Sequence, residues 1–546
     1  MVDQVPLFSI ITPVYNPPID ALQDTIASVL AQTCTDWEWI LVDDCSTDPA
    51  ILETLRRLAA DERRVKLIER ETNGHIVAAS NDGVAAARGE FIALLDHDDL
   101  LTPDALAANA EVIGKFDDVD YIYSDEDKDD GTGKRYDEFQ KPPWSPERLR
   151  AQNYCCHFSV LRTALVREVG SFRPGFDGSQ DHDLFLRVTE RARRVEHIRK
   201  VLYHWRVVPG SAAGEVDAKP YAADAAIRAV QDHLDRTGIK AVAVPGPFAG
   251  IIQLHRTLPP ERSVSIVIPT IGSSGLVWGR SRVLVVDAVR SALAMTNHEN
   301  LEIVVVYDLP TPVEVLRELR DIAGDKLVLV PFREEFNYAR KMNFGVLASR
   351  GERIILLNDD VEVRTQNWVE ELVAPLEEPD VGMTGAMLLF SSNTIQHVGH
   401  AYYRGHYGHP GSFTPYRKSG LWGSHHINRE VSGVTAACAG MRREVFLEVG
   451  GFSEQFPANF NDVDLCYKVS AAGYRIITLG VVELFHFETM TRDSGVKKWE
   501  ITKMRERWGY PIRDAYTPVF PRMAPTKAEE AEQKAREMRR RLEKAQ

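Results

Sequence analysis

The stretch FIALLDHDDLLTPDAL, residues 91–106, places an apolar run directly before a crowded group of acids. The five apolar residues Phe91–Leu95 predict a buried strand, and three aspartates around one histidine, residues 96–99, follow it at once. Carboxylates at this spacing repel one another, so the group lowers stability unless a cation or hydrogen bonds compensate. Because open α/β sheets bind ligands at the carboxyl ends of their strands, the group indicates a binding site.

The residues that precede this stretch have the pattern of a parallel sheet covered by helices. FSIITPVYN (8–16) predicts a strand, and a helix with an apolar face follows it. A second buried strand, Trp37–Val42, ends in two further aspartates. Strand, helix and strand in this order predict an α/β fold with a Rossmann-like, mostly parallel central sheet. The apolar face of the helix consists of Leu22, Ile26, Val29 and Leu30.

The chain contains this pattern twice. VSIVIPTIG (264–272) matches FSIITPVYN, and LLNDDVEV (356–363) matches the acid group. Further along, GSFRPGFDGSQDHDLFLRV (170–188) matches GGFSEQFPANFNDVDLCYKV (450–469). Motifs repeated in the same order indicate an internal duplication. We therefore expect an N-terminal domain at 1–213, a connector at 214–262, a C-terminal domain at 263–524 and a charged helix at 525–546.

The composition excludes some classes of protein. The net charge of −14, from 65 basic and 79 acidic residues, argues against nucleic acid as the main partner. Six cysteines among 546 residues are too few for a disulfide framework, which favours a reducing compartment. Neither a signal peptide nor a run of eighteen apolar residues is evident. The expectation is a cytoplasmic protein, with peripheral association at the inner face of the plasma membrane left open.

Each half offers the same chemical groups in the same order. An acid group at a strand end is followed by a second pair of aspartates, in QDHD and NDVD, and then by one histidine. Carboxylates and one imidazole suit Mg²⁺ or Mn²⁺, whose other ligands would be the oxygens of a diphosphate. One aspartate of each later pair would act as a general base on a hydroxyl, and the other would cap the helix that begins there. A metal-dependent phosphohydrolase would also use clustered carboxylates.

The motifs SIITPVYN, VDDCSTD, LLDHDD, GSQDHD and YHWR resemble those of family 2 nucleotide-sugar glycosyltransferases with the GT-A fold. The second half, with SIVIPT, LLNDDVEV, QHVGH and FHFET, resembles the rhamnan and O-antigen-type branch of bacterial polysaccharide biosynthesis. The resemblance implies two tandem inverting transferase domains that extend a bacterial surface glycan. It implies a nucleotide-sugar donor (UDP-, dTDP- or GDP-linked) and a glycan or lipid-linked glycan acceptor.

The resemblance also assigns roles to residues that match the family's motifs. Asp181 and Asp462 would be the general bases. The metal, Mn²⁺ or Mg²⁺, would be held by Asp98 and His204 in the first half and by Asp360 and His486 in the second. The nucleotide would contact Pro13, Tyr15, Asp44, Asp96, Pro269, Asp308 and Asn358.

The second half departs from the family pattern at two of these positions. Asn358 replaces the first acid of the metal motif, and Ile271 replaces the tyrosine found at Tyr15. Unequal donor specificity would follow. The alternative is one active transferase domain beside a degenerate carbohydrate-binding or scaffold domain.

Two segments rich in polar residues have no single interpretation. Residues 396–426 hold six histidines among aromatic residues and glycines, which favours an acceptor-side loop over structural packing or a zinc site. Residues 124–139, SDEDKDDGTGKRYDEF, favour a solvated loop, although Asp125 and Glu126 would otherwise face an acceptor.

Overall fold

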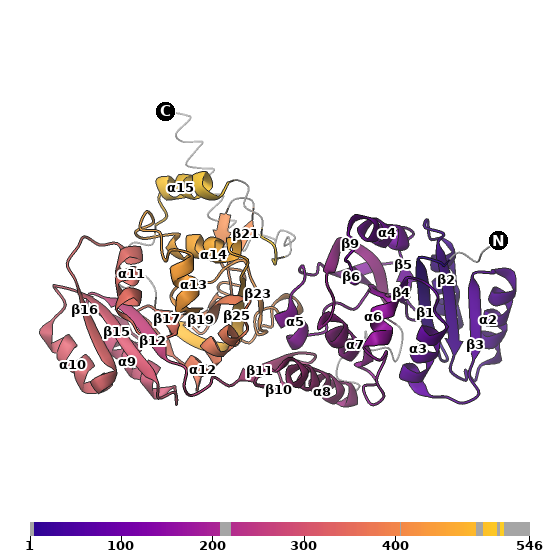
Figure 1. The fold of residues 1–546 in the computed structure, drawn as a ribbon, viewed down its shortest axis with the longest axis horizontal. Helices are drawn as coiled ribbons and strands as arrows, with labels where there is room; N and C mark the ends of the chain where they lie inside the picture. The colour runs from indigo at the N-terminus through magenta and orange to yellow at the C-terminus, as the bar shows by residue number, and fades with distance from the viewer. Residues whose placement is uncertain (1–4, 208–219, 404–405, 488–494, 510–513, 518–546) are drawn as a thin grey trace.

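The computed structural model describes residues 5–207, 220–403, 406–487, 495–509 and 514–517, and they form two α/β lobes side by side (Figure 1). The first lobe is built on a sheet of nine strands, in the order β3-β2-β1-β4-β8-β6-β9-β5, with β7 paired to β6. Its first four strands in this order run parallel to one another, and the pairs that follow are antiparallel except β6 with β9, which is parallel. The strands are β1 (Phe8–Val14), β2 (Trp37–Asp43), β3 (Val65–Glu69), β4 (Phe91–Leu94), β5 (Leu100–Leu101), β6 (Tyr121–Asp129), β7 (Arg135–Phe139), β8 (Ser159–Arg162) and β9 (Val195–Arg206).

The second lobe repeats this sheet. Its strand order is β16-β15-β12-β17-β24-β19-β25-β18, and every strand corresponds in place and direction to one of the first lobe. The duplication and the α/β fold predicted from the sequence are therefore confirmed. The strands are β12 (Val264–Thr270), β15 (Leu301–Asp308), β16 (Leu327–Phe332), β17 (Arg353–Leu357), β18 (Val361–Val363), β19 (Val381–Leu389), β24 (Cys438–Arg442) and β25 (Arg475–His486), with β20 (Ile395–His397) and β23 (Arg429–Glu430) paired at the edges and the hairpins β13 (Ser274–Val277)–β14 (Arg280–Val283) and β21 (Ala401–Tyr403)–β22 (His406–Gly408) added.

Helices cover both faces of each sheet, because successive strand residues point to opposite faces and both sets are apolar. In β1, for example, Ile10 packs under α1, α2 and α4, and Ile11 packs under α3, α6 and α7. Leu30, expected on the apolar face of α1, is instead 43% exposed, because the helix ends there. The helices of the first lobe are α1 (Ile19–Leu30), α2 (Pro49–Asp61), α3 (His75–Ala86), α4 (Ala105–Lys115), α5 (Pro146–Ala151), α6 (Thr163–Glu168) and α7 (Gln180–Thr189), and those of the second are α9 (Leu284–Ala294), α10 (Val313–Ala323), α11 (Tyr338–Ala348), α12 (Trp368–Val373), α13 (Arg443–Glu448), α14 (Asn461–Ala471) and α15 (Lys498–Trp508).

The expected connector contains a helix and a hairpin that pack against the first lobe. α8 (Pro220–Thr237) lies beside α7, and the hairpin β10 (Ala241–Pro245)–β11 (Ile252–Arg256) follows it (Figure 1). Ala229, Leu234 and Leu254 belong to the same apolar core as α7. The charged helix expected at 525–546 lies outside the described residues.

Buried ion pairs join the two lobes. Glu147 of α5, which is fully buried, accepts hydrogen bonds from both terminal nitrogens of Arg256, each at 2.7 Å. Arg150 joins Glu147 to Glu378 of the second lobe, at 2.9 Å from each. Arg475 in β25 also binds Glu378, at 3.1 Å. Since a buried charge is costly without its partner, these pairs couple the relative placement of the two lobes.

The prediction of a solvated loop over 124–139 is wrong for its first half. Asp125, Glu126 and Asp127 lie in β6, a strand inside the sheet, and all three are buried. The local sequence is strongly charged, and tertiary partners compensate each charge. Asp125 contacts His197 at 2.7 Å, and Glu126 contacts Lys141 at 3.1 Å.

Candidate functional site

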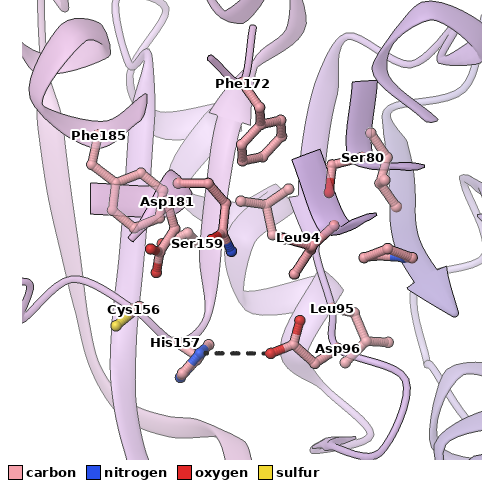
Figure 2. A pocket seen from close by; sticks show the side chains of 14 residues that line it. Ser80, Leu94, Leu95, Asp96, Cys156, His157, Ser159, Phe172, Asp181 and Phe185 are labelled. Carbon is pink, nitrogen blue, oxygen red and sulfur yellow. Dashed lines mark ion pairs between the residues drawn. The ribbon is translucent and has the colours of Figure 1, made fainter. Parts of the chain in front are cut away.

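The first lobe has a pocket with a cavity volume of about 60 Å³ at the carboxyl ends of β1 and β4. Pro13, Asp96 and Asp181 line it, so two predicted nucleotide contacts and the predicted base share one cavity. Figure 2 shows the Asp96 carboxylate across the pocket from Asp181. The same sheet edge thus gathers residues that lie far apart in the sequence, as expected for an open α/β fold.

His157 is a cation beside the acid group, and the sequence did not suggest this role. Its ring lies 4.0 Å from Asp96, as Figure 2 shows by a dashed line. The ring also lies 3.4 Å from Glu126 and stacks on Tyr203. Burial disfavours the charged ring, but the hydrogen bond and charge of Glu126, with those of Asp96 and Asp99, outweigh burial and raise the pKa of His157 to about 9. The imidazolium therefore offsets part of the repulsion among the carboxylates.

Asp99 is turned away from the pocket. It is 1% exposed, and its carboxylate accepts hydrogen bonds from the Tyr203 hydroxyl at 2.5 Å and from the Arg206 backbone N–H at 2.7 Å. Burial, with the charges of Asp96 and Asp98, raises the pKa of Asp99 well above its usual range. These two hydrogen bonds connect Asp99 to β9.

The predicted metal ligands of the first lobe, Asp98 and His204, are not in contact with each other. Within the described ranges, the ion-pair partner of Asp98 is His97, at 3.9 Å. His204 lies opposite Leu100 in the β5–β9 ladder and contacts Asp127 through Nδ1 at 2.5 Å. His204 lines a neighbouring pocket together with Arg206 and Asp129.

In the second lobe the corresponding residues do meet. His486 Nε2 lies 3.2 Å from Asp360 Oδ1 and 3.3 Å from the side-chain amide of Asn358. His486 Nδ1 lies 2.7 Å from Gln396 Oε1, which can only accept, so the ring proton belongs on Nδ1. When the ring is neutral, Nε2 is an acceptor that faces the Asp360 carboxylate, and a cation between them would satisfy both.

The predicted divalent metal fits this donor set. The Asp360 carboxylate and the His486 imidazole are ligands that Mn²⁺ accepts, and Gln396 orients the imidazole from behind. Asn358 turns its amide nitrogen toward His486 and its oxygen toward the Tyr338 hydroxyl. Gln396 was missed from the sequence, because it lies 90 residues before His486 and no spacing links them.

Asp359 lies between Asn358 and Asp360 in the sequence and contacts the strand β12. It accepts a hydrogen bond from the Thr270 hydroxyl at 2.6 Å. Burial and the neighbouring Asp360 raise the pKa of Asp359 to about 7. The second acid group is thus crowded, as the first is.

Asp181 and Asp462 occupy the same place in the two lobes. Each carboxylate accepts a hydrogen bond from the next backbone N–H at 2.8 Å, at the start of α7 and of α14. Asn153 donates to the other oxygen of Asp181 at 2.9 Å, and the Ala436 N–H lies 3.4 Å from that of Asp462. Both carboxylates are oriented by neighbours.

The expected helix caps are wrong. Ser179 and Phe460 stand at the N-caps, and neither makes a side-chain cap. The second aspartate of each pair is fully buried and binds arginines instead. Asp183 pairs with Arg173 and Arg187, and Asp464 pairs with Arg507 and accepts a hydrogen bond from the Trp508 ring. These contacts compensate the buried charge of Asp183 and of Asp464, so neither carboxylate is available to cap its helix.

The predicted nucleotide-base contacts already have basic partners. Asp44 binds Arg70 at 2.6 Å and the Gly74 N–H at 2.9 Å, and Asp308 binds Lys341 at 2.8 Å. Neither Arg70 nor Lys341 was expected from the sequence, since the two residues come from different elements and lie at different spacings from their aspartates.

The flanking residues differ between the lobes. Tyr15 and its counterpart Ile271 are similarly exposed, at 47% and 46%, but only Tyr15 is aromatic. Pro269 is buried within β12. An aromatic surface is therefore available to a base in the first lobe and absent at the same position of the second.

Comparison with known proteins decides the family. The model of the family described as glycosyl transferase family 2 matches residues 9–170 and again 265–450. The chain belongs to this family, with two copies of its domain.

Two relatives match nearly the whole chain. The uncharacterized protein y4gI of Sinorhizobium fredii (strain NBRC 101917 / NGR234) is 42% identical over 92% of this chain and 56% of its own length. The O-antigen biosynthesis protein RfbC of Myxococcus xanthus is 36% identical over 89% of this chain and 38% of its own. The chain thus spans little more than half of the first relative and less than half of the second.

Among solved structures, TarS of S. aureus (residues 1–349, with UDP-GlcNAc) is 21% identical, with a TM-score of 0.36, over 42% of this chain and 66% of that one. Among the described helices, none combines the length and the apolar character needed to cross a membrane.

Proposed function

We propose that this family 2 protein is a bifunctional inverting glycosyltransferase. Each domain would transfer a sugar from a nucleotide-sugar donor to a growing bacterial surface glycan, with a divalent metal, Mn²⁺ or Mg²⁺, and an aspartate general base. The proposed domains are 1–213 and 263–524, with 214–262 between them.

The observation that carries this proposal is the duplicated arrangement of carboxylates. In each lobe an acid group ends the fourth strand of the parallel set, and an oriented aspartate begins a helix of the same sheet edge. In the first lobe Asp96 and Asp181 line the same pocket. Two sites of the same design in one chain support two transfer reactions.

The protein's own residues would act as follows. Asp181 or Asp462 would accept the proton of an acceptor hydroxyl as its oxygen attacks the anomeric carbon, from the face opposite the departing nucleoside diphosphate. This attack inverts the configuration at that carbon. Asn153 and the backbone N–H groups hold the carboxylates at the angle that the hydroxyl needs. A bound divalent ion would neutralise the negative charge that grows on the diphosphate.

The printed names of two relatives support a polysaccharide product. RfbC is named for O-antigen biosynthesis, and an Escherichia coli chondroitin synthase is 30% identical over 43% of this chain. We propose a glycan or lipid-linked glycan acceptor, and a cytoplasmic location that includes peripheral contact with the inner face of the plasma membrane. The donor nucleotide would be UDP, dTDP or GDP.

The test is a panel of nucleotide sugars and glycan acceptors with Mn²⁺ or Mg²⁺. Wild type is compared with Asp181→Asn and Asp462→Asn singly, and with Asp36→Asn as a control at an exposed position remote from both sites. Each base variant should lose at least a hundredfold in the turnover of its own donor.

The pattern of losses separates the alternatives. Loss of different donors or linkages in the two variants establishes two transferase sites. Loss in Asp181→Asn alone would make the second domain a binding or scaffold domain. Release of sugar phosphate or nucleotide without any acceptor would favour a phosphohydrolase and contradict the proposal.

A further inference from the structure

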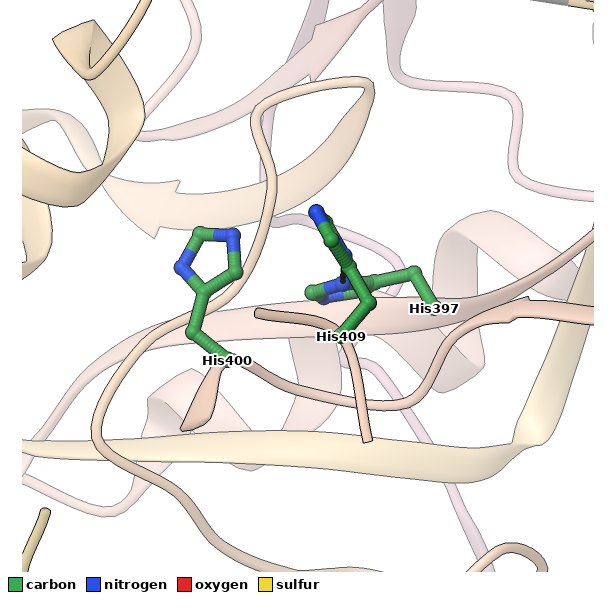
Figure 3. A group of neighbouring side chains, drawn as sticks. All are labelled: His397, His400 and His409. Atoms are coloured by element: carbon green, nitrogen blue, oxygen red, sulfur yellow. Dashed lines mark hydrogen bonds between the residues drawn. The ribbon is translucent and has the colours of Figure 1, made fainter. Parts of the chain in front are cut away.

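The histidine-rich segment 396–426 of the second lobe, which we call the insertion, brings three imidazoles together. His397 ends β20, His400 follows it, and His409 comes directly after β22. One ring nitrogen of each lies within 4.8 Å of the others, and Figure 3 shows the three rings converging. We refer to these three residues as the histidine cluster.

Burial keeps two of the three rings neutral. Burial, the main cause, lowers the pKa of His400 to about 4 and that of His397 well below its usual range. His397 and His400 are 1% and 4% exposed, and His409 is exposed to solvent. Neutral imidazoles keep a lone pair at ordinary pH, which is the form that binds transition metals.

His400 has a ring nitrogen without a partner. Its Nδ1 is buried and makes no hydrogen bond within the ranges that the structure describes. An unsatisfied buried polar atom costs about 1–3 kcal/mol, so its retention needs a reason. A ligand bound among the three rings supplies one.

We propose that the histidine cluster is a transition-metal site, distinct from the carboxylate sites, that takes an ion of the Zn²⁺ class. Three nitrogen ligands and no carboxylate favour Zn²⁺, Co²⁺, Ni²⁺ or Cu²⁺ over Mg²⁺ and Mn²⁺. The exposed side of His409 leaves a further coordination position to solvent. Three protein ligands with one open position is the composition of zinc sites that bind an exchangeable ligand.

The site lies on the acceptor side of the second lobe. Asp462, the proposed general base, lies close enough to His400 that its negative charge raises the pKa of that ring, against the larger effect of burial. A hydroxyl bound at the open position of the ion would therefore approach Asp462. The ion binding itself does not depend on the proposed transfer reaction.

Binding requires a local rearrangement. His397 Nδ1 and His409 Nδ1 share a hydrogen bond at 2.7 Å, whereas two nitrogens on a tetrahedral Zn²⁺ are about 3.3 Å apart. His397 Nε2 accepts the Thr435 N–H at 3.1 Å. For Nδ1 to bind the ion, the ring proton must move to Nε2, and this hydrogen bond is then lost. We therefore expect weaker binding than at a closed four-ligand site.

The experiment titrates the tag-free, metal-stripped full chain with Co²⁺ alone, without nucleotide. Asp98→Asn and Asp360→Asn are introduced first, to weaken the carboxylate sites. We expect one equivalent of Co²⁺ with the visible absorption of a nitrogen-bound, low-coordinate ion, displaced by Zn²⁺ and not by millimolar Mg²⁺.

Two histidine variants in this background locate the ion. His409→Ala alters an exposed ligand and should weaken Co²⁺ binding at least tenfold with the fold intact by circular dichroism. His425→Asn, in the same insertion but outside the cluster, should leave binding unchanged. Absence of the absorption, its displacement by Mg²⁺, or its survival in His409→Ala would overturn the proposal.

Discussion

His157 shows how one residue compensates a group of like charges. The carboxylates that end β4 face an imidazolium that arrives from a distant segment and is held by Glu126. The repulsion predicted from the sequence is therefore met partly by the protein itself, before any ion or substrate binds.

This imidazolium makes stability depend on pH. Its pKa is about 9 in the folded chain and about 6.5 when unfolded, so its contribution is complete below pH 6.5 and is lost as the pH rises through 9. The full effect is on the order of 3 kcal/mol. Urea denaturation at pH 6.5 and 9.5 should show the loss in wild type and a smaller loss in His157→Gln. Equal losses in both proteins would contradict the assignment.

Gln396 contacts Nδ1 of His486, and Asp127 contacts Nδ1 of His204, the two histidines predicted to bind metal. Gln396→Leu removes the acceptor that fixes the His486 proton, and should weaken Mn²⁺ binding in the second lobe ten- to hundredfold. Manganese titration of Gln396→Leu in an Asp98→Asn background measures this directly. Asp127→Asn is the matched change for the first lobe, and it should leave the second site unaffected.

At the scale of the elements, each sheet contains the same polar contact at the end opposite its site. Ser9 of β1 donates to Glu38 of β2 at 2.7 Å and accepts the Gly89 N–H at 2.8 Å. Ser265 makes the same contacts with Glu302 and the Gly351 N–H in the second lobe. The duplication thus preserved a buried polar contact as well as a strand order.

Gly89 has no room for a side chain. A methyl group there would lie 2.5 Å from the Ser9 backbone nitrogen, so Gly89→Ala should destabilise the protein by about 1–3 kcal/mol. Gly114→Ala is the control, because that helical position is open and alanine should stabilise it by about 0.5–1 kcal/mol. Chemical denaturation measures both, and equal stabilities would contradict the packing argument.

Across the molecule, α5 links the first site to the second lobe. Its residue Leu149 accepts a hydrogen bond from His182, next to the proposed base, while Glu147 and Arg150 join the ion pairs between the lobes. Trp422 of the insertion stacks on Phe139 of the first lobe at 4.3 Å. The wall of the first site therefore rests on residues of the second lobe.

Glu147→Ala tests this coupling. The change removes one of the two carboxylates that Arg256 and Arg150 share, leaving only Glu378, and should cost about 3–5 kcal/mol. We expect calorimetry to resolve separate unfolding of the lobes in this variant. Glu318→Ala, which breaks the exposed pair with Arg290, should change stability by less than about 1 kcal/mol. A Glu147→Ala protein as stable as this control would show that the lobes are not coupled through α5.

The sequence by itself determined the duplication, the α/β class, the strands that end in acids and the aspartates that begin α7 and α14. These features depend on local apolar patterns and on motifs repeated in order, which are legible without partners. It misjudged β6, because a charged strand in the middle of a sheet is stabilised only by residues such as Lys141 and His197 from other elements.

Only the tertiary structure decided which charged and polar groups meet. The contacts of Asp44 with Arg70, His486 with Gln396 and Glu147 with Arg256 join elements at unrelated separations in sequence. It also separated Asp98 from His204 while bringing Asp360 to His486, although the motifs that hold the two pairs match each other. The reason is register: β5 sets Leu100 opposite His204, whereas β18 sets Val361, the neighbour of Asp360, opposite His486. A shift of one residue in a strand pair is invisible in the motifs and moves a side chain to the other face of the sheet.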